Sequence, residues 1–464
     1  MQSQSSTSPG RPSRRVLITG AGAVSLALCL AACAPGSGTA GPSASGEASA
    51  GFDTTKDVTL TIADGWGTSG TGEVFADVIA QFEAKYPNVT IERDTTDYNS
   101  HTSSIALKAS SPTPPDVMML TTTGYGQGFY DFVRADLLLP LDDYSKLYDW
   151  PSRVGSDAAL DVFRFDTGKG NQWGSGALFG VPEQSNVIGV FYNKSLLAKA
   201  GFDAPPTSLA EFESTLSGAK AAGITAIAQS STYIHTNMAL WGSFAADAKE
   251  VNDWVYGASG SFSDPANVTA AQKIQDWQGA GYFQDGASGT SDSDAAGLFL
   301  NGESMYYISG SWMAGGVDSN LGDDGGVFLL PGSSSSSPVG GGLSTPLVIS
   351  SKTQHPDVAA AFLDFFLSAE TSDFLYTNGW GVPGGLVSSS DLASGPTSAS
   401  VLDLIDHTQA GPGTFPFLDW AAPQFTTLLP TELQKMAAGQ STPEQYTNLV
   451  QSDWESFQQT RKSS

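Results

Sequence analysis

Apolar and polar residues alternate along residues 57–64 (DVTLTIAD), which is the pattern of a half-buried strand. Residues 73–87 then repeat apolar side chains at helical spacing, so we predict a helix that ends at its proline. Residues 88–94 predict a second strand, and residues 103–110 and 116–122 repeat the helix and strand pattern. This β-α-β order predicts a largely parallel sheet and an α/β fold. The apolar stripe of the first helix comprises Val74, Phe75, Val78, Ile79 and Phe82.

The pattern of apolar, glycine and proline residues changes around residues 180–212. We predict a strand over Val187–Tyr192 and a helix of about two turns that ends at Gly201, where glycine supplies the left-handed stop. Thr207 or Ser208 is placed to cap a following helix, because Glu211 stands at capping-box distance.

The N-terminus has the order of an export signal. Arg14 and Arg15 precede an uncharged apolar run over residues 16–32, and small residues follow. The adjacent arginines resemble a twin-arginine signal, although a general secretory signal also accommodates two arginines.

The segment Leu30-Ala31-Ala32-Cys33 resembles a bacterial lipoprotein box, which predicts a lipid on Cys33; the alternative is an unused cysteine. Residues 33–52 are rich in Gly, Ala, Ser and Pro and predict a flexible tether after a signal of residues 1–32. We therefore expect a body outside the cytoplasm that is held at the outer face of a membrane. With Cys29 removed in the signal, thiol catalysis and cysteine-ligated metal sites are excluded.

Composition narrows the class of partner. Removing residues 1–32 leaves 18 basic and 47 acidic side chains, a net charge of −29, which repels nucleic acid and anionic lipid. The remaining sequence suits two or three domains with an ample core, and no later segment is long and apolar enough to span a bilayer.

Residues 180–212 (GVPEQSNVIGVFYNKSLLAKAGFDAPPTSLAEF) resemble the central signature of family 1 extracellular solute-binding proteins, the maltose-binding-protein type that serves ABC importers. The sequence departs slightly from that pattern, with Ser208-Leu209 where a tryptophan commonly follows the threonine. Four other segments resemble the family in the same order along the chain: residues 60–92, 114–120, 295–315 and 340–383.

The resemblance implies a two-lobed periplasmic-binding-protein-like fold of type II, with a ligand cleft between α/β lobes. It places lobe 1 at residues 53–183 and 340–395, and lobe 2 at 184–339 and 396–464. The chain would cross between lobes near Val181–Val187, Leu330–Gly341 and Ser390–Ser400.

A sugar site needs aromatic planes for stacking and polar side chains for orientation. The sequence holds 10 Trp and 14 Tyr, and several follow predicted strands, where open α/β sheets bind ligands. Trp66 follows the first strand, while Tyr125 and Gln127 follow the third. The resemblance adds a family ligand position at Glu183 and the cleft tryptophan at Trp312. The remaining candidates are Tyr233, Trp241, Trp380, Asp419 and Trp420.

The resemblance further implies a monomer that closes its lobes on a mono- or oligosaccharide and delivers it to an ABC permease with a separate ATPase. We expect no cofactor and no metal, because the sequence shows no phosphate loop, no GxSxG elbow and no HExxH frame. The four histidines are scattered and are expected at surfaces or helix ends: His101, His235, His355 and His407.

Two other classes stay open. A secreted glycoside hydrolase would use two carboxylates in an aromatic cleft, for example Glu183 and Asp419. A tethered lectin or adhesion module would bind carbohydrate without an importer. Incubation with oligosaccharides separates turnover from stoichiometric binding.

Overall fold

The computed structural model describes residues 48–49, 51–68, 70–120, 124–125, 128–168, 170–334 and 336–463. The predicted signal, the lipidation site at Cys33 and most of the predicted tether lie outside the described residues.

The first β-α-β unit has the predicted elements. Strand β1 (Val58–Asp64) pairs in parallel with β2 (Val89–Thr95) and with β3 (Val117–Met119). Helices α1 (Thr71–Lys85) and α2 (Tyr98–Ser110) connect these strands. The predicted stripe of α1 is buried except for Val74, which is half-buried.

Two long strands carry the sheet from this unit to the second half of the chain. Strand β7 (Val181–Asn193) pairs antiparallel with β11 (Val339–Ile349), from Leu347 opposite Val181 to Gly341 opposite Val187. The strand that we predicted over Val187–Tyr192 is therefore longer, because its first residues find backbone partners in β11 that no local pattern reveals. The sheet order is β2-β1-β3-β11-β7-β9-β8.

Beyond β7 the sheet is completed by β9 (Ser304–Gly310), which pairs antiparallel with β7, and β8 (Thr225–Ala228), which pairs in parallel with β9. Strand β10 (Gly325–Phe328) also pairs with β7, and β12 (Thr414–Phe415) pairs with β11. A separate small sheet has the order β5-β4-β6, formed by β4 (Arg164–Asp166), β5 (Gln172–Trp173) and β6 (Ala177–Leu178).

The remaining helices fall into two sets. Those within residues 53–183 and 340–395, called the first half below, are α3 (Phe129–Arg134), α4 (Asp142–Tyr148), α5 (Trp150–Val154), η1 (Ala158–Phe163), α13 (Pro356–Phe366), α14 (Ala369–Thr377) and η5 (Ser390–Leu392). The others are α6 (Lys194–Lys199), α7 (Leu209–Ala221), α8 (Ile234–Phe244), α9 (Ala248–Val255), α10 (Pro265–Ala280), η2 (Ala287–Gly289), α11 (Asp292–Leu300), η3 (Ser311–Met313), α12 (Ala314–Leu321), η4 (Gly322–Asp324), α15 (Pro396–Ala410), η6 (Leu418–Ala421), α16 (Phe425–Ala437) and α17 (Pro443–Ser463).

Local signals of the middle segment are confirmed. Gly201 follows α6 with φ of 96°, a conformation that suits glycine. Ser208 caps α7 by accepting a hydrogen bond from the backbone N–H of Glu211, while the Glu211 carboxylate accepts from Thr207.

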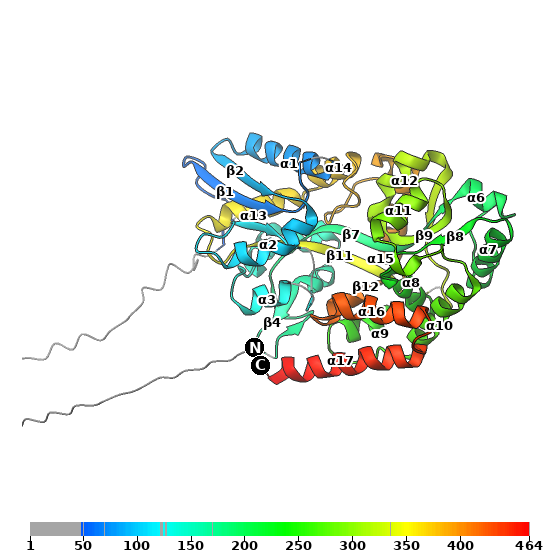
Figure 1. Cartoon of the computed structure of the whole chain (residues 1–464). Coiled ribbons are helices and arrows are strands. Elements are labelled where there is room, and N and C mark those ends of the chain that lie inside the picture. The colour runs from blue at the N-terminus through cyan, green and yellow to red at the C-terminus, as the bar shows by residue number, and fades with distance from the viewer. Residues whose placement is uncertain are drawn as a thin grey trace, which may run out of the picture. The chain divides into compact units, whose positions relative to one another are not determined.

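The last helix, α17, links distant parts of the chain (Figure 1). Its early residues pack beside α10 in the second half, and its end reaches the small sheet of the first half. There the buried Arg461 donates to the carbonyls of Gly170, Asn171 and Gly257. The last helix is thus anchored by hydrogen bonds to segments between 204 and 291 residues away in the sequence.

One histidine prediction is wrong. His101 is fully buried in α2, and its Nε2 lies 2.8 Å from the carbonyl oxygen of Met119. Because a carbonyl only accepts, this nitrogen carries the proton, and burial lowers the pKa of the imidazole. His355 and His407 do stand at helix ends.

Candidate functional site

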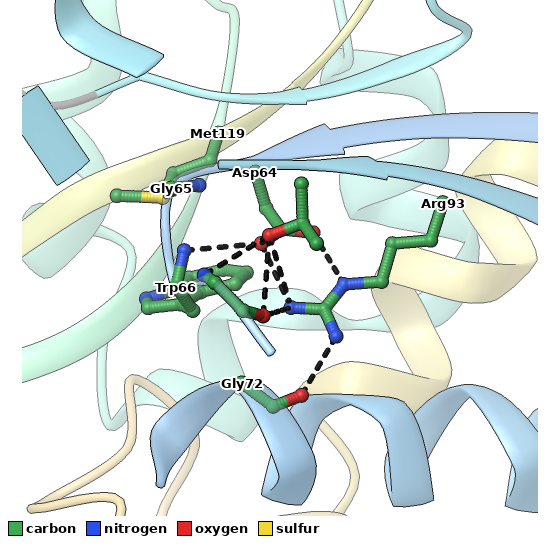
Figure 2. Close-up of polar contacts among 8 residues, drawn as sticks. Asp64, Gly65, Trp66, Gly72, Arg93 and Met119 are labelled. Carbon is green, nitrogen blue, oxygen red and sulfur yellow. Dashed lines mark hydrogen bonds and ion pairs between the residues drawn. The ribbon is translucent and has the colours of Figure 1, made fainter. Parts of the chain in front are cut away.

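The loop after β1 is held by one buried carboxylate (Figure 2). Asp64 accepts two hydrogen bonds from Arg93, from Nε at 2.6 Å and Nη2 at 2.8 Å. It also accepts from the backbone N–H of Trp66 at 3.1 Å. The same guanidinium donates to the carbonyls of Gly67 and Gly72, at 3.1 and 2.7 Å. The loop that carries Trp66 is therefore tied at both ends to one bidentate ion pair.

The indole of Trp66 is half-buried at the edge of the first half. Its ring packs against Phe75 and Trp380, with centroid distances of 4.5 and 4.8 Å. Its side chain also makes a hydrogen bond to Glu183, a buried residue of β7. Burial raises the pKa of Glu183 well above its usual range, and the nearby Asp64 acts in the same direction. Burial thus disfavours the ionised form of Glu183, and the hydrogen bond from Trp66 opposes this effect.

A second aromatic group gathers around Trp312, directly after β9. This indole is 42% exposed although it lies among other rings. His235 lies 5.4 Å and Phe417 6.1 Å from it, measured between ring centroids, and Trp420 lies 4.9 Å from Phe417. An exposed, laterally supported indole offers an apolar plane to solvent, which is what the ring face of a sugar needs.

Strand β7 connects the two aromatic groups. Trp66 contacts Glu183 on this strand, while Ser311, the neighbour of Trp312, accepts a hydrogen bond from the backbone N–H of Val187. These two anchoring points are four residues apart, which corresponds to about 13 Å along a strand.

Asp419 lies between Phe417 and Trp420 in the sequence and is half-buried. Burial raises the pKa of its carboxyl to about 6, against a backbone hydrogen bond that lowers it. Near neutral pH this group exchanges between donor and acceptor forms, and both forms can bind a hydroxyl.

Five of the predicted aromatic site residues are part of the core. Tyr125, Tyr233, Trp241 and Trp380 are at most 3% exposed, and Trp420 is 6% exposed. The hydroxyl of Tyr125 donates to the backbone carbonyl of Asn171, so its ring is committed to packing. In this conformation these side chains offer almost no face to a ligand. Gln127 lies outside the described residues.

Sequence reasoning missed His235 and Phe417. Burial lowers the pKa of His235, while the Asp292 carboxylate opposes that effect, so its imidazole is neutral at pH 7. Phe417 had a signal, since it stands in the aromatic segment FPFLDW that supplied Asp419 and Trp420. His235 had none, because a single histidine near a helix start carries no partner pattern.

A cavity of about 710 Å³ opens beside the paired strands β7 and β11, and Val187 is among its lining residues. The lining also includes Asn186, Leu343, Asp406 and Gln409, and Tyr256 is the one aromatic ring among its described lining residues. None of the nine predicted ligand residues that the structure describes lines it. The volume suits a small molecule, but the lining lacks the paired ring faces of the aromatic groups.

The described ranges contain no group of three or more His, Cys, Asp or Glu side chains that could hold a metal ion. No helix in these ranges is long and apolar enough to cross a membrane.

Comparisons with known proteins agree with this architecture. The family model described as "Bacterial extracellular solute-binding protein" matches residues 66–372. A binding protein of Brucella abortus (strain 2308) is 22% identical over 276 residues, which are 56% of this chain and 59% of that relative. The match therefore spans less than two thirds of the relative's length.

Solved structures share the fold at low identity. A chitin oligosaccharide binding protein superimposes with a TM-score of 0.72 and 21% identity, over 87% of this chain and 99% of the other. The GacH receptor of Streptomyces glaucescens GLA.O, whose structures include a complex with acarbose, gives 0.67 and 18%, over 87% and 99%. A secreted solute-binding lipoprotein of Streptomyces coelicolor gives 0.66 and 15%, over 85% and 98%. The architecture is that of two-lobed α/β solute-binding proteins.

Proposed function

The chain belongs to the bacterial extracellular solute-binding proteins, and from that premise we propose that it binds a mono- or oligosaccharide between Trp66 and Trp312 and releases it unaltered. The observation that carries this proposal is the exposed indole of Trp312, supported by His235 and Phe417. The ring supplies stacking, and Asp419, two residues after Phe417 in the sequence, supplies a polar partner for hydroxyls.

The structural neighbours suggest which sugars to test first. One is named for chitin oligosaccharide, and another was solved with acarbose. At such low identity they share the fold with this chain, and the ligand does not transfer automatically. Two further structures with the same fold are named for xylan utilization and for a complex with raffinose. Chitotriose, xylotriose, raffinose and acarbose therefore form the first panel.

We assign the binding step to closure of two lobes, with the boundaries expected from the sequence: residues 53–183 and 340–395 against 184–339 and 396–464. Ligand favours the closed form because only there do both lobes touch it. A monomer tethered by lipid on Cys33 outside the cytoplasm would deliver the sugar to an ABC permease with a separate ATPase. Scattering measurements with and without sugar test the closure, since an unchanged radius of gyration at saturation contradicts it.

The hydrolase alternative makes a different prediction. A retaining or inverting glycosidase needs one ionised carboxylate beside one acid. Burial raises the pKa of Glu183 well above its usual range and that of Asp419 to about 6, which leaves Asp419 mostly ionised at pH 7. Glu183 supports Trp66, however, whereas Asp419 follows Phe417 in the other aromatic group. Sugar turnover by the purified protein would establish the hydrolase, and sugar binding without any sugar uptake by cells that carry the protein would favour the lectin.

The decisive experiment combines a thermal-shift screen with titration calorimetry. A sugar that binds the folded state raises the melting temperature by mass action. We expect Trp312→Ala to weaken binding about tenfold or more, equivalent to about 1.4 kcal/mol, with a small change in melting temperature because the indole is exposed. Gln409→Ala, in the lining of the cavity beside β7 and β11, is the matched control and should bind as the wild type does. The reverse result would move the site to that cavity.

A further inference from the structure

Among the ion pairs of the described residues, the pair between Asp64 and Arg93 differs in that its carboxylate is fully buried. Asp64 is fully buried, and Arg93 is 14% exposed on its side chain. A buried pair is costly to desolvate and gives weak evidence for stabilisation by itself. Its geometry instead indicates that the pair fixes one conformation of the Trp66 loop, because its hydrogen bonds converge on that loop.

The hydrogen bonds of Arg93 reach three separate points around that loop. The fork of its guanidinium holds Asp64 at the end of β1, and its remaining N–H groups hold the carbonyls of Gly67 and Gly72 (Figure 2). Asp64 in turn accepts from the backbone N–H of Trp66. Arginine, with five donors in a planar fork, can satisfy all these acceptors together, whereas lysine has one nitrogen.

The loop needs such a brace because its own backbone is poorly constrained. Gly67 and Gly70 adopt φ of 70° and 56°, and helix α1 begins at Thr71 without a side-chain cap. Glycine at these positions leaves other backbone conformations of the loop accessible. The backbone beside Trp66 is therefore held by Asp64, Arg93 and Thr95, while the ring packs on Phe75 and Trp380.

We propose that Arg93 is a positioning residue for ligand binding: it holds the Trp66 loop in its binding conformation and sets sugar affinity without touching the sugar. This proposal rests on the proposed function, because it assigns Trp66 to one wall of the sugar site. Its physical basis is preorganisation, since a wall that is already ordered has less entropy to lose on binding.

The test replaces Arg93 by lysine, which keeps the cation beside Asp64 but loses the fork. Arg153→Lys is the matched control, since Arg153 also pairs with a partly buried aspartate, Asp364, in another part of the first half. Chitotriose, xylotriose, raffinose and acarbose are titrated into each variant at a temperature where all are folded. We expect Arg93→Lys to raise the dissociation constant about tenfold, and Arg153→Lys to leave it within about twofold.

A double-mutant cycle separates positioning from general destabilisation. If Arg93 acts through Trp66, Arg93→Lys causes no further loss of affinity in a Trp66→Ala background. Additive losses, or wild-type affinity in Arg93→Lys, overturn the proposal.

Hydrogen exchange of the Trp66 and Gly67 amides gives a readout without ligand. We expect both amides to exchange faster in Arg93→Lys than in the wild type, while Arg153→Lys leaves them unchanged. Unchanged exchange overturns the positioning role. If the wild type binds none of the four sugars, the proposed function fails for this panel, whereas faster exchange still supports the brace.

Discussion

Replacing Asp419 by asparagine tests whether this carboxyl is desolvated as the fold places it. Burial raises its pKa from the ordinary 3.8 to about 6. Below about pH 4 the folded and unfolded chains both hold the proton, so the carboxyl has no effect on the pH dependence of stability. Between about pH 4 and 6 the folded protein keeps a proton that the unfolded chain has lost, and stability falls as the pH rises. Above about pH 6 the loss is complete.

The size of the effect follows from the two pKa values. A rise from 3.8 to about 6 corresponds to a loss of at most about 3 kcal/mol between pH 4 and 7, at about 1.4 kcal/mol per pKa unit. Asparagine has a similar shape and does not titrate, so the variant does not suffer this loss. For a body of this size the difference corresponds to about 3 °C in melting temperature.

Calorimetric melts of the wild type and Asp419→Asn at pH 4, 5, 6, 7 and 8 measure the effect. We expect the melting temperature of the variant to gain on the wild type from pH 4 to 7 and then to keep that lead. Asp203→Asn, at an exposed aspartate, is the control and should show no such trend. A difference between Asp419→Asn and the wild type that is constant across this pH range would refute the reasoning, because it would mean that the carboxyl is solvated.

Two further predictions concern buried groups. Burial raises the pKa of Glu183 well above the ordinary 4.5, so the stability of the wild type falls as the pH rises above 4.5. Glu183→Gln should therefore have a higher melting temperature than the wild type at pH 8 but not at pH 4. An equal difference in melting temperature at both pH values would contradict this. Arg461→Met removes the donors to the Gly170 and Gly257 carbonyls and should lower the free energy of unfolding, measured in urea, by about 3 kcal/mol. Lys462→Met, at an exposed neighbour, should change it by about 0.5 kcal/mol or less. Similar losses in both variants would argue against the anchoring role of Arg461.

Local patterns predicted the regular elements well. The alternation in β1 and the stripe of α1 each follow from one face meeting the core, so the sequence alone reveals them. The cap at Ser208 and the stop at Gly201 depend on neighbours within four residues. The start of β7 was missed because its pairing partner, β11, lies more than 150 residues away.

The sequence by itself determined the types of element, their order, the acidic charge and the supply of aromatic rings. Only the tertiary structure decided which rings remain available, because burial depends on neighbours from other segments. Trp241 and Trp312 have the same side chain and both belong to the second half, yet one is 1% and the other 42% exposed. Trp241 is covered by rings such as Trp254 and Phe262, whereas Trp312 is flanked by His235 and Phe417 and keeps a face in solvent. The brace of Arg93 on Asp64 arises in the same way, since the pairing of β1 with β2 places Arg93 opposite Ile62, two residues from Asp64 and on the same face of the sheet.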